Sequence, residues 1–188
     1  MSYLVIDILD GVRVDYYDDS FNLKSSSSTN EKASQCLHST INSVLEKENL
    51  NRFNSTYIFN KGPGSYTGLR LLQGFQDILE LEEIECFSFY SFEILAELPS
   101  DTLWLSRAFK GEYLLVNHHE GIFQQKRVTS FNKELSYIGI EEIEGVDIKL
   151  FRNIEKTLVT KLIKKVVEKK SNQGVFYYRP LEEEFKRK

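Results

Sequence analysis

Residues 62–70 read Gly-Pro-Gly-Ser-Tyr-Thr-Gly-Leu-Arg, and this stretch decides how the chain is interpreted. The apolar run 56–59 precedes it and an amphipathic pattern follows it to about Leu81, so it lies between a strand and a helix. The two glycines beside the proline let the backbone turn tightly. The sequence therefore predicts a strand, a tight turn and a helix in succession.

The start of this helix has two possible roles. Ser65 or Thr67 can cap it, and its other free N–H groups then point outward as a general anion site. The stretch is not a phosphate-binding P-loop, because no Gly-Lys-Ser/Thr ends the glycine run. It is not a nucleophile elbow of the Gly-x-Ser-x-Gly type, because Gly64 precedes Ser65 directly. Anion binding and a plain structural turn both stay open.

Apolar periodicity predicts alternating strands and helices over the first half of the chain. Strands are expected at 3–6, 12–16, 56–59 and 86–90, and helices at about 33–45 and from the glycine motif to about 81, with a short helix through Phe92 and Leu95. Ser28 and Glu31 have the spacing of a capping box in front of the first helix. The stretch 24–30, with four consecutive serines, is interpreted as a loop.

The second half is expected to form a separate, smaller lobe. Pro99 punctuates the chain, and a boundary there gives lobes of residues 1–99 and 100–188. Strands are expected at 103–109, 112–117, 122–128 and 175–178 and a helix at 154–170, whereas residues 132–149 show no clear pattern. Strands alternating with helices in both lobes predict an α/β fold.

Composition and charge exclude several classes of protein. The 188 residues carry a formal net charge of −4, so no global positive field would attract RNA to this chain alone. The lysine-rich face of the last helix is either simply solvated or in contact with tRNA phosphates; it comprises Lys156, Lys161, Lys164, Lys165, Lys169 and Lys170. No apolar run reaches the length of a membrane span and no signal-peptide pattern opens the chain, so a cytoplasmic location is expected.

The few cysteines and histidines do not form a catalytic or metal-binding pattern. Cys36 and Cys86 lie in apolar segments without metal-ligand spacing, so buried thiols in a reducing compartment are expected. His118 and His119 are neighbours on a predicted strand and would point to opposite faces, so they cannot chelate one ion. His38 has no histidine or acid three or four residues away. We expect no catalytic residue and no metal site.

The stretch 62–70 resembles the Gly-Pro-Gly-Ser-Phe/Tyr-Thr-Gly-Val/Leu-Arg signature of the TsaB family, also known as YeaZ-type proteins. Weaker similarities extend along the chain. The opening run 4–7 is similar to the family's first strand, residues 111–112 to its Gly-Glu pair, and residues 175–179 to its closing Tyr-Leu-Arg segment. The first lobe is covered well by the resemblance and the second only loosely.

The resemblance implies an actin-like, RNase H-like fold of two related lobes, with the second lobe reduced in this chain. It also implies a function as a non-catalytic subunit in bacterial synthesis of threonylcarbamoyladenosine on tRNA. In that machinery TsaB pairs with the catalytic subunit TsaD, which transfers threonylcarbamoyl to the adenosine next to the anticodon, and the ATPase TsaE joins them. ATP and metal are then expected on the partner proteins, tRNA is met through the complex, and a homodimer is possible when the chain is alone.

Three positions depart from the family pattern. Asp7 is followed by Ile8 and not by the usual threonine, whose hydroxyl cradles phosphate in this fold class. Arg107 and Phe109 stand where family members tend to carry an aspartate and a basic residue. These departures argue against nucleotide binding in the cleft of this subunit.

The motif and the first two helices supply the expected partner surface. The apolar residues of the second helix span about 180° of its circumference, whereas a helix on one sheet needs about 100°. Either the first helix covers the surplus, or both helices form an intermolecular bundle with a partner. The motif residues given a structural or interface role are Gly62, Pro63, Gly64, Ser65, Tyr66, Thr67, Gly68 and Arg70. The residues expected at the partner interface are Cys36, Leu37, Ile41, Val44, Leu71, Leu72, Phe75, Ile78 and Leu79.

Two alternatives from other classes remain. One is a nucleotide-binding kinase of the same fold class, which nucleotide titration would reveal. The other is a standalone homodimeric scaffold without a role in tRNA modification. A peptidase is disfavoured, because the sequence has neither a nucleophile motif nor a metal-binding pair of histidines.

Overall fold

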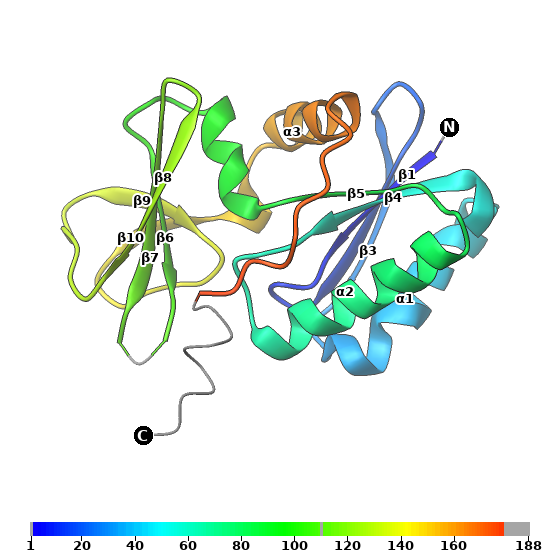
Figure 1. Ribbon diagram of the computed structural model, residues 1–188, viewed down its shortest axis with the longest axis horizontal. Coiled ribbons are helices and arrows are strands. Elements are labelled where there is room, and N and C mark those ends of the chain that lie inside the picture. Colours follow the sequence, from blue (N-terminus) through cyan, green and yellow to red (C-terminus); the bar gives the residue numbers. More distant parts are fainter. Residues whose placement is uncertain (1, 110, 179–188) are drawn as a thin grey trace. The chain divides into compact units, whose positions relative to one another are not determined.

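The computed structural model describes residues 2–109 and 111–178, which form two compact units (Figure 1). The first unit comprises residues 2–90 and 163–176, and the second comprises residues 91–162 and 177–178. The division therefore differs from the boundary expected after residue 99. Residues 91–97 belong to the second unit because Phe92 is buried there against the rings of Trp104 and Phe123.

The first unit contains a five-stranded mixed sheet in the order β3-β2-β1-β4-β5. Its strands are β1 (Ser2–Asp7), β2 (Val12–Tyr17), β3 (Leu23–Thr29), β4 (Ser55–Asn60) and β5 (Cys86–Phe89). Strand β1 pairs antiparallel with β2 and parallel with β4, and β4 pairs parallel with β5. All six residues of β4 are buried, as expected of a central parallel strand.

Helices α1 (Ala33–Lys47) and α2 (Tyr66–Leu81) lie side by side on one face of this sheet (Figure 1). Leu4 and Ile6 of β1 and Tyr57 and Phe59 of β4 face the helices and form the core with them. Alternation along β1 turns Tyr3 to the opposite face, where its ring stacks on Phe21. The sequence correctly predicted both helices.

The serine-rich stretch expected as a loop is the edge strand β3. It pairs antiparallel with β2, so the β2 backbone supplies its hydrogen bonds even though its side chains give little apolar signal. Ser28 lies inside this strand and cannot cap α1, so the predicted capping box is wrong. The N-cap residue is Lys32, which makes no side-chain cap, and Thr29 Oγ1 accepts a hydrogen bond from Glu31 N at 3.2 Å.

The second unit contains another five-stranded sheet, in the order β10-β9-β6-β7-β8. Its strands are β6 (Leu103–Arg107), β7 (Tyr113–His119), β8 (Ile122–Val128), β9 (Ser136–Gly139) and β10 (Asp147–Leu150). The two short strands β9 and β10 lie in the region without a clear pattern, because four residues are too few to show a period. A 3₁₀ helix, η2 (Ser91–Glu97), precedes this sheet.

Helix α3 (Lys156–Glu168) follows the second sheet, and its second half belongs to the first unit. Lys164 Nζ lies 5.5 Å from the centroid of the Phe21 ring, on the sheet face opposite α1 and α2. The chain then continues as residues 171–176, here named the C-terminal strap. The strand expected at 175–178 is not formed, and the family similarity at Arg179 lies outside the described residues. Among residues 2–109 and 111–178, no helix has the length and apolar character needed to cross a membrane.

Candidate functional site

The glycine motif forms the turn between β4 and α2, as the sequence predicted. Gly62 has φ = 115°, a conformation that glycine adopts without strain. Ser65 is the N-cap of α2, and its Oγ accepts a hydrogen bond from Gly68 N at 3.3 Å. The guanidinium of Arg70 lies 4.8 Å from the centroid of the Tyr66 ring, so these two motif residues pair across the first turn of α2.

Close packing explains the other glycines of the motif. A Cβ atom added to Gly64 would lie 2.4 Å from Leu9 Cδ2, and one added to Gly68 would lie 2.9 Å from Ser65 Oγ. A Cβ atom added to Gly62 would lie 3.2 Å from Phe176 Cβ in the C-terminal strap. The turn is therefore enclosed between the β1–β2 hairpin and the strap. Gly64 does not have a positive φ, so contact with Leu9, and not backbone conformation, is what its small size serves.

A hydrogen-bonded network at the carboxyl ends of β1 and β4 holds this turn. Asp7 Oδ1 accepts from Leu9 N at 2.8 Å, and Asp7 Oδ2 accepts from Asn60 Nδ2 at 2.9 Å. Asn60 Oδ1 in turn accepts from Gly62 N at 3.4 Å. Burial raises the pKa of Asp7 above its ordinary value, although the bonds from Leu9 and Asn60 and the nearby Arg13 oppose this shift. Asp7 thus connects the first hairpin to the glycine motif.

Lys61 lies between this network and α2, and its side chain is fully buried. Its Nζ donates to Gln73 Oε1 at 2.6 Å and lies 5.5 Å from the centroid of the Phe59 ring. Gln73 Nε2 donates to Asp77 Oδ1 at 2.6 Å. Burial lowers the pKa of Lys61 to about 8, against the opposing charges of Asp77 and Glu80. A buried lysine beside a neutral amide is an uncommon arrangement that folding alone does not favour.

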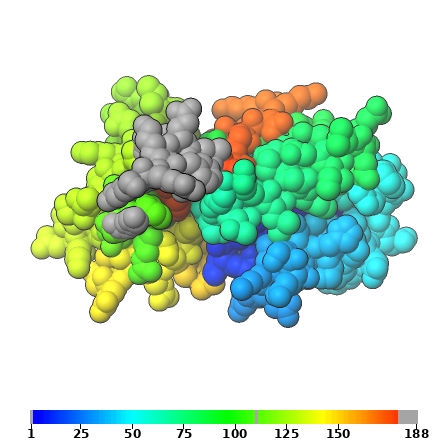
Figure 2. Space-filling model, turned by 60° about the horizontal axis from the view of Figure 1, so that its bottom comes forward, coloured from blue at the N-terminus to red at the C-terminus, as the bar shows by residue number. Residues whose placement is uncertain are grey.

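One exposed face of α2 is apolar. We name it the α2 ridge, and it consists of Leu71, Ile78 and Leu81 with Gly74 between them. Leu71 is 36% exposed, Ile78 54% and Leu81 85%. Apart from its chain neighbours and the backbone of its own helix, no atom lies within 4 Å of a Cβ added to Gly74, so another backbone can approach α2 closely at the centre of the ridge. Figure 2 shows α2 at the surface of the first unit beside α1.

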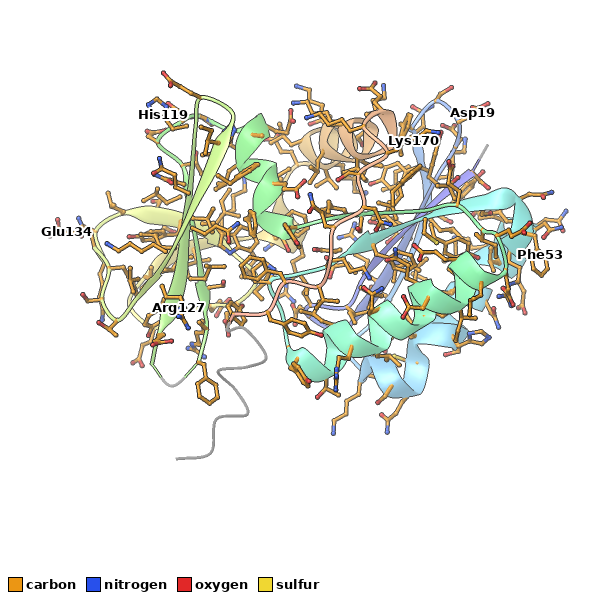
Figure 3. The ribbon with its side chains drawn as sticks, in the orientation of Figure 1. Asp19, Phe53, His119, Arg127, Glu134 and Lys170 are labelled. Atoms are coloured by element: carbon orange, nitrogen blue, oxygen red, sulfur yellow. The ribbon has the colours of Figure 1, made fainter. Side chains whose placement is uncertain are left out.

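A further exposed ring lies at the C-terminal end of the ridge. Phe53 belongs to the 3₁₀ helix η1 (Arg52–Asn54) and is 60% exposed (Figure 3). Arg52 forms an ion pair with Glu82, the residue that directly follows α2, at 2.5 Å. This bond ties η1 to the end of the helix that bears the ridge.

Six of the nine residues expected at a partner interface are buried in the first unit's own core and do not reach its surface: Cys36, Leu37, Ile41, Val44, Leu72 and Leu79. Phe75 is half-buried, with its ring edge-on to Tyr57, Phe59 and His38. Leu72, Leu79 and Phe75 of α2 pack in one core with α1 and the sheet, so these elements cover much of the apolar arc of α2. The outer face of α1 itself is polar. Only Leu71 and Ile78 of the nine stand clearly exposed.

The reactive side chains are dispersed. Among the residues that the structure describes, no group of three His, Cys, Asp or Glu side chains is arranged to hold a metal ion. The ring of His118 packs on Phe123, and His119 lies at the end of the β7–β8 hairpin (Figure 3). Both cysteines are buried and free, as the sequence predicted. Burial raises the pKa of Cys86 to about 12, so its thiolate is scarce at neutral pH.

Arg107 and Phe109, which depart from the family pattern, lie in the second unit. Arg107 pairs with Glu141, with NH1 and Oε2 3.7 Å apart, and its backbone N–H donates to Glu141 Oε1 at 3.0 Å. Phe109 is 41% exposed.

The sequence did not single out Asn60, Lys61 or Gly74. A signal was available for the first two, because they are polar and directly follow the buried run 56–59. Polar residues at the carboxyl end of a parallel strand commonly form sites in α/β proteins. Gly74 would have required knowledge of which face of α2 points outward.

The strand order, the helices on the first sheet and the second five-stranded sheet define an actin-like α/β protein of two units. The chain is similar to the solved structure of YeaZ from Pseudomonas aeruginosa, with a TM-score of 0.65 over 92% of this chain and 95% of that one. It is also similar to a structure described as an uncharacterized protein with similarity to peptidase YeaZ from Pseudomonas aeruginosa. In that case the TM-score is 0.63, over 93% of this chain and 99% of that one.

Identity to each of these structures is 12%, so the likeness concerns the fold. Because nearly the whole of both chains is covered, it extends over both units. No family model and no curated protein matches the chain by sequence.

Proposed function

We propose that the chain is a non-catalytic partner subunit of the bacterial machinery that makes threonylcarbamoyladenosine on tRNA. In this proposal it pairs with a TsaD-like catalytic subunit, and a TsaE-like ATPase joins the pair. Three observations support the proposal: the TsaB-like signature at 62–70, the YeaZ-like fold and the exposed α2 ridge. The ridge is the observation that carries it, because the helix opened by the signature presents apolar side chains to solvent.

The ridge is suited to another helix. Leu71, Ile78 and Leu81 lie at helical spacing on one side of α2, with Gly74 between them as a point of close approach. Burying a fully exposed leucine or isoleucine stabilises an association by about 1.5–3 kcal/mol. A stable specific interface buries about 1,200–2,000 Å² in total. An interface centred on α2 would therefore have to include residues next to the helix. The exposed Phe53 at the end of α2 is the nearest candidate.

We place ATP and metal on the partner proteins and give this subunit a cytoplasmic location. The carboxylate of Asp7, which would serve a nucleotide site, is already bonded to Leu9 and Asn60. Ile8 supplies no hydroxyl beside it. Contact with tRNA is then made through the complex, and a second copy of the chain can occupy the ridge when no partner is present.

Charge substitution on the ridge tests the proposal. Ile78→Glu should leave the chain folded and abolish co-purification with the catalytic subunit, because a buried unpaired carboxylate costs several kcal/mol. The matched control is Ile122→Glu, since Ile122 is 63% exposed on β8 of the second unit. Loss of the partner in both variants, or in neither, would place the interface elsewhere than on α2.

A further inference from the structure

Lys61 has no role in partner docking, yet it is the only lysine among the fully buried large side chains of the described chain. Within residues 2–109 and 111–178, its Nζ has a single hydrogen-bond acceptor, the neutral amide oxygen of Gln73. The charged groups that face it are Asp77 and Glu80 from α2, and Cys86 faces it from β5. An ammonium in this position is poorly compensated, because it lacks a direct carboxylate partner.

The C-terminal strap is one of the elements packed against Lys61. Its Phe176 N donates to the backbone oxygen of Lys61 at 3.0 Å, and its Asn172 Oδ1 accepts from Gln76 Nε2 at 3.1 Å. Gln76 also donates to Glu80, one of the carboxylates that face Lys61. The strap therefore contacts the backbone of Lys61 directly and is connected through Gln76 to Glu80, a carboxylate that acts on the Lys61 ammonium.

The strap is attached to β5 through Ser88 and, next to the end of that strand, through the Phe176 ring, whose centroid lies 5.4 Å from that of the Tyr90 ring. Ser88 N donates to Ser171 O at 2.8 Å, Gln173 N donates to Ser88 Oγ at 2.5 Å, and Ser88 Oγ donates to Gln173 O at 2.9 Å. None of the six strap residues is buried. Helix α2, by contrast, buries Leu69, Leu72, Gln76 and Leu79. Segments with few buried contacts open at the lowest free energy, so the strap is the element that can yield to the lysine.

We propose that Lys61 makes closure of the C-terminal strap proton-dependent, so that the strap is held more tightly when the lysine is neutral. When Lys61 takes up a proton, its ammonium gains by reaching water, and detachment of the strap provides the route with the fewest broken contacts. This device is independent of the proposed partner function and would operate in the isolated chain.

The direction and size of the effect follow from linkage. Burial lowers the pKa of Lys61 from 10.5 to about 8, whereas a detached strap restores hydration and the ordinary value. The closed form is thus disfavoured below pH 8, and this penalty disappears as pH rises from 8 to 10.5. The opening equilibrium constant of the strap should fall about tenfold between pH 7 and pH 9.

Hydrogen exchange of the isolated chain measures this equilibrium. Exchange of the 171–176 segment, corrected for the intrinsic pH dependence of amide exchange, should slow about tenfold between pH 7 and pH 9. Lys61→Met, which carries no charge, should abolish this change. Lys47→Met is the matched control on exposed α1 surface and should retain it. The buried strand β1 serves as the internal reference.

Three results would overturn the proposal. A wild-type strap without this pH dependence would show that Lys61 is not linked to strap closure. The same dependence in Lys61→Met would assign it to another group. If exchange in β1 changes in parallel with the strap, protonation acts on global unfolding and not on a local latch. Should Lys61→Met fail to fold, Lys61→Arg stays charged throughout and should hold the strap in its more open, pH-independent state.

Discussion

The bond between Asp7 and Asn60 is expected to hold the glycine motif in place, and exchanging the two residues tests this directly. Asp7→Asn turns an amide donor toward Asn60 Nδ2, so a 2.9 Å hydrogen bond is replaced by two facing donors. Leaving a buried donor without its acceptor costs about 1–3 kcal/mol. Part of this cost is offset, because the buried carboxylate of Asp7, with its raised pKa, is removed.

The reciprocal variant should be the worse one. Asn60→Asp places a second carboxylate within hydrogen-bond distance of Asp7, in a position where the side chain of residue 60 is fully buried. At neutral pH this like-charge pair should cost more than about 3 kcal/mol, and the loss should shrink toward pH 5 as the two carboxylates share a proton.

The double variant Asp7→Asn/Asn60→Asp restores every bond in the network. The amide introduced at position 7 can donate to the carboxylate introduced at position 60, which can still accept from Gly62 N. The amide oxygen at position 7 accepts from Leu9 N, as the carboxylate does in the wild type. Urea unfolding at pH 7 should therefore place the double variant within about 1 kcal/mol of the wild type, with a coupling energy of about 3 kcal/mol or more. Additive losses would refute the role assigned to this bond.

Five other outcomes are expected, each measured by urea unfolding unless stated. Gly62→Ala should lose about 1–3 kcal/mol from backbone strain, because φ is 115° there, and an unchanged midpoint would contradict this. Gly64→Ala should lower the free energy of unfolding by only about 0.5–1.5 kcal/mol, since the half-buried Leu9 can change rotamer. Gly74→Ala on the open ridge should raise it by about 0.5–1 kcal/mol. A Gly74→Ala variant less stable than Gly64→Ala would contradict the contacts described. Ser65→Ala should lower the free energy of unfolding by about 1 kcal/mol through loss of the α2 cap. Equal unfolding midpoints for Ser65→Ala and the wild type would show that the cap does not stabilise the helix. The buried thiol of Cys86 should resist alkylation in the native state at pH 8, as measured by mass spectrometry, and rapid modification would disprove its enclosure.

Much of the first unit was predictable because its elements carry strong periodic signals. The run 56–59 and the glycine motif predicted the β4–α2 junction, and α1 and α2 follow from apolar residues at helical spacing. Strand β3 was missed, since four serines carry no apolar alternation and the strand depends on pairing with β2. The segment 175–178 was mistaken for a strand for the opposite reason: it is apolar and aromatic, but it pairs with no strand among the described residues.

The candidate site was predicted only in part. The signature located the turn, but a helical wheel cannot show which part of a wide apolar arc faces the sheet, the neighbouring helix or solvent. Leu72 and Phe75, natural choices for a charge substitution, prove to be fully and half-buried, whereas Ile78 is the exposed one. Lys61 could not be identified as buried, because a lysine after a strand usually extends into water. Its burial depends on α2 and the strap, which come from distant parts of the sequence.

The central claim is that this chain has no transferase activity of its own and is needed by a catalytic partner. The direct measurement is formation of threonylcarbamoyladenosine on tRNA in vitro, with the purified chain, a TsaD-like subunit and a TsaE-like ATPase from the same organism and a supply of threonylcarbamoyl donor. We expect product only when the chain is present with its partners, none from the chain alone, and a large loss with Ile78→Glu but not with Ile122→Glu. Full product formation in the absence of the chain would contradict the account.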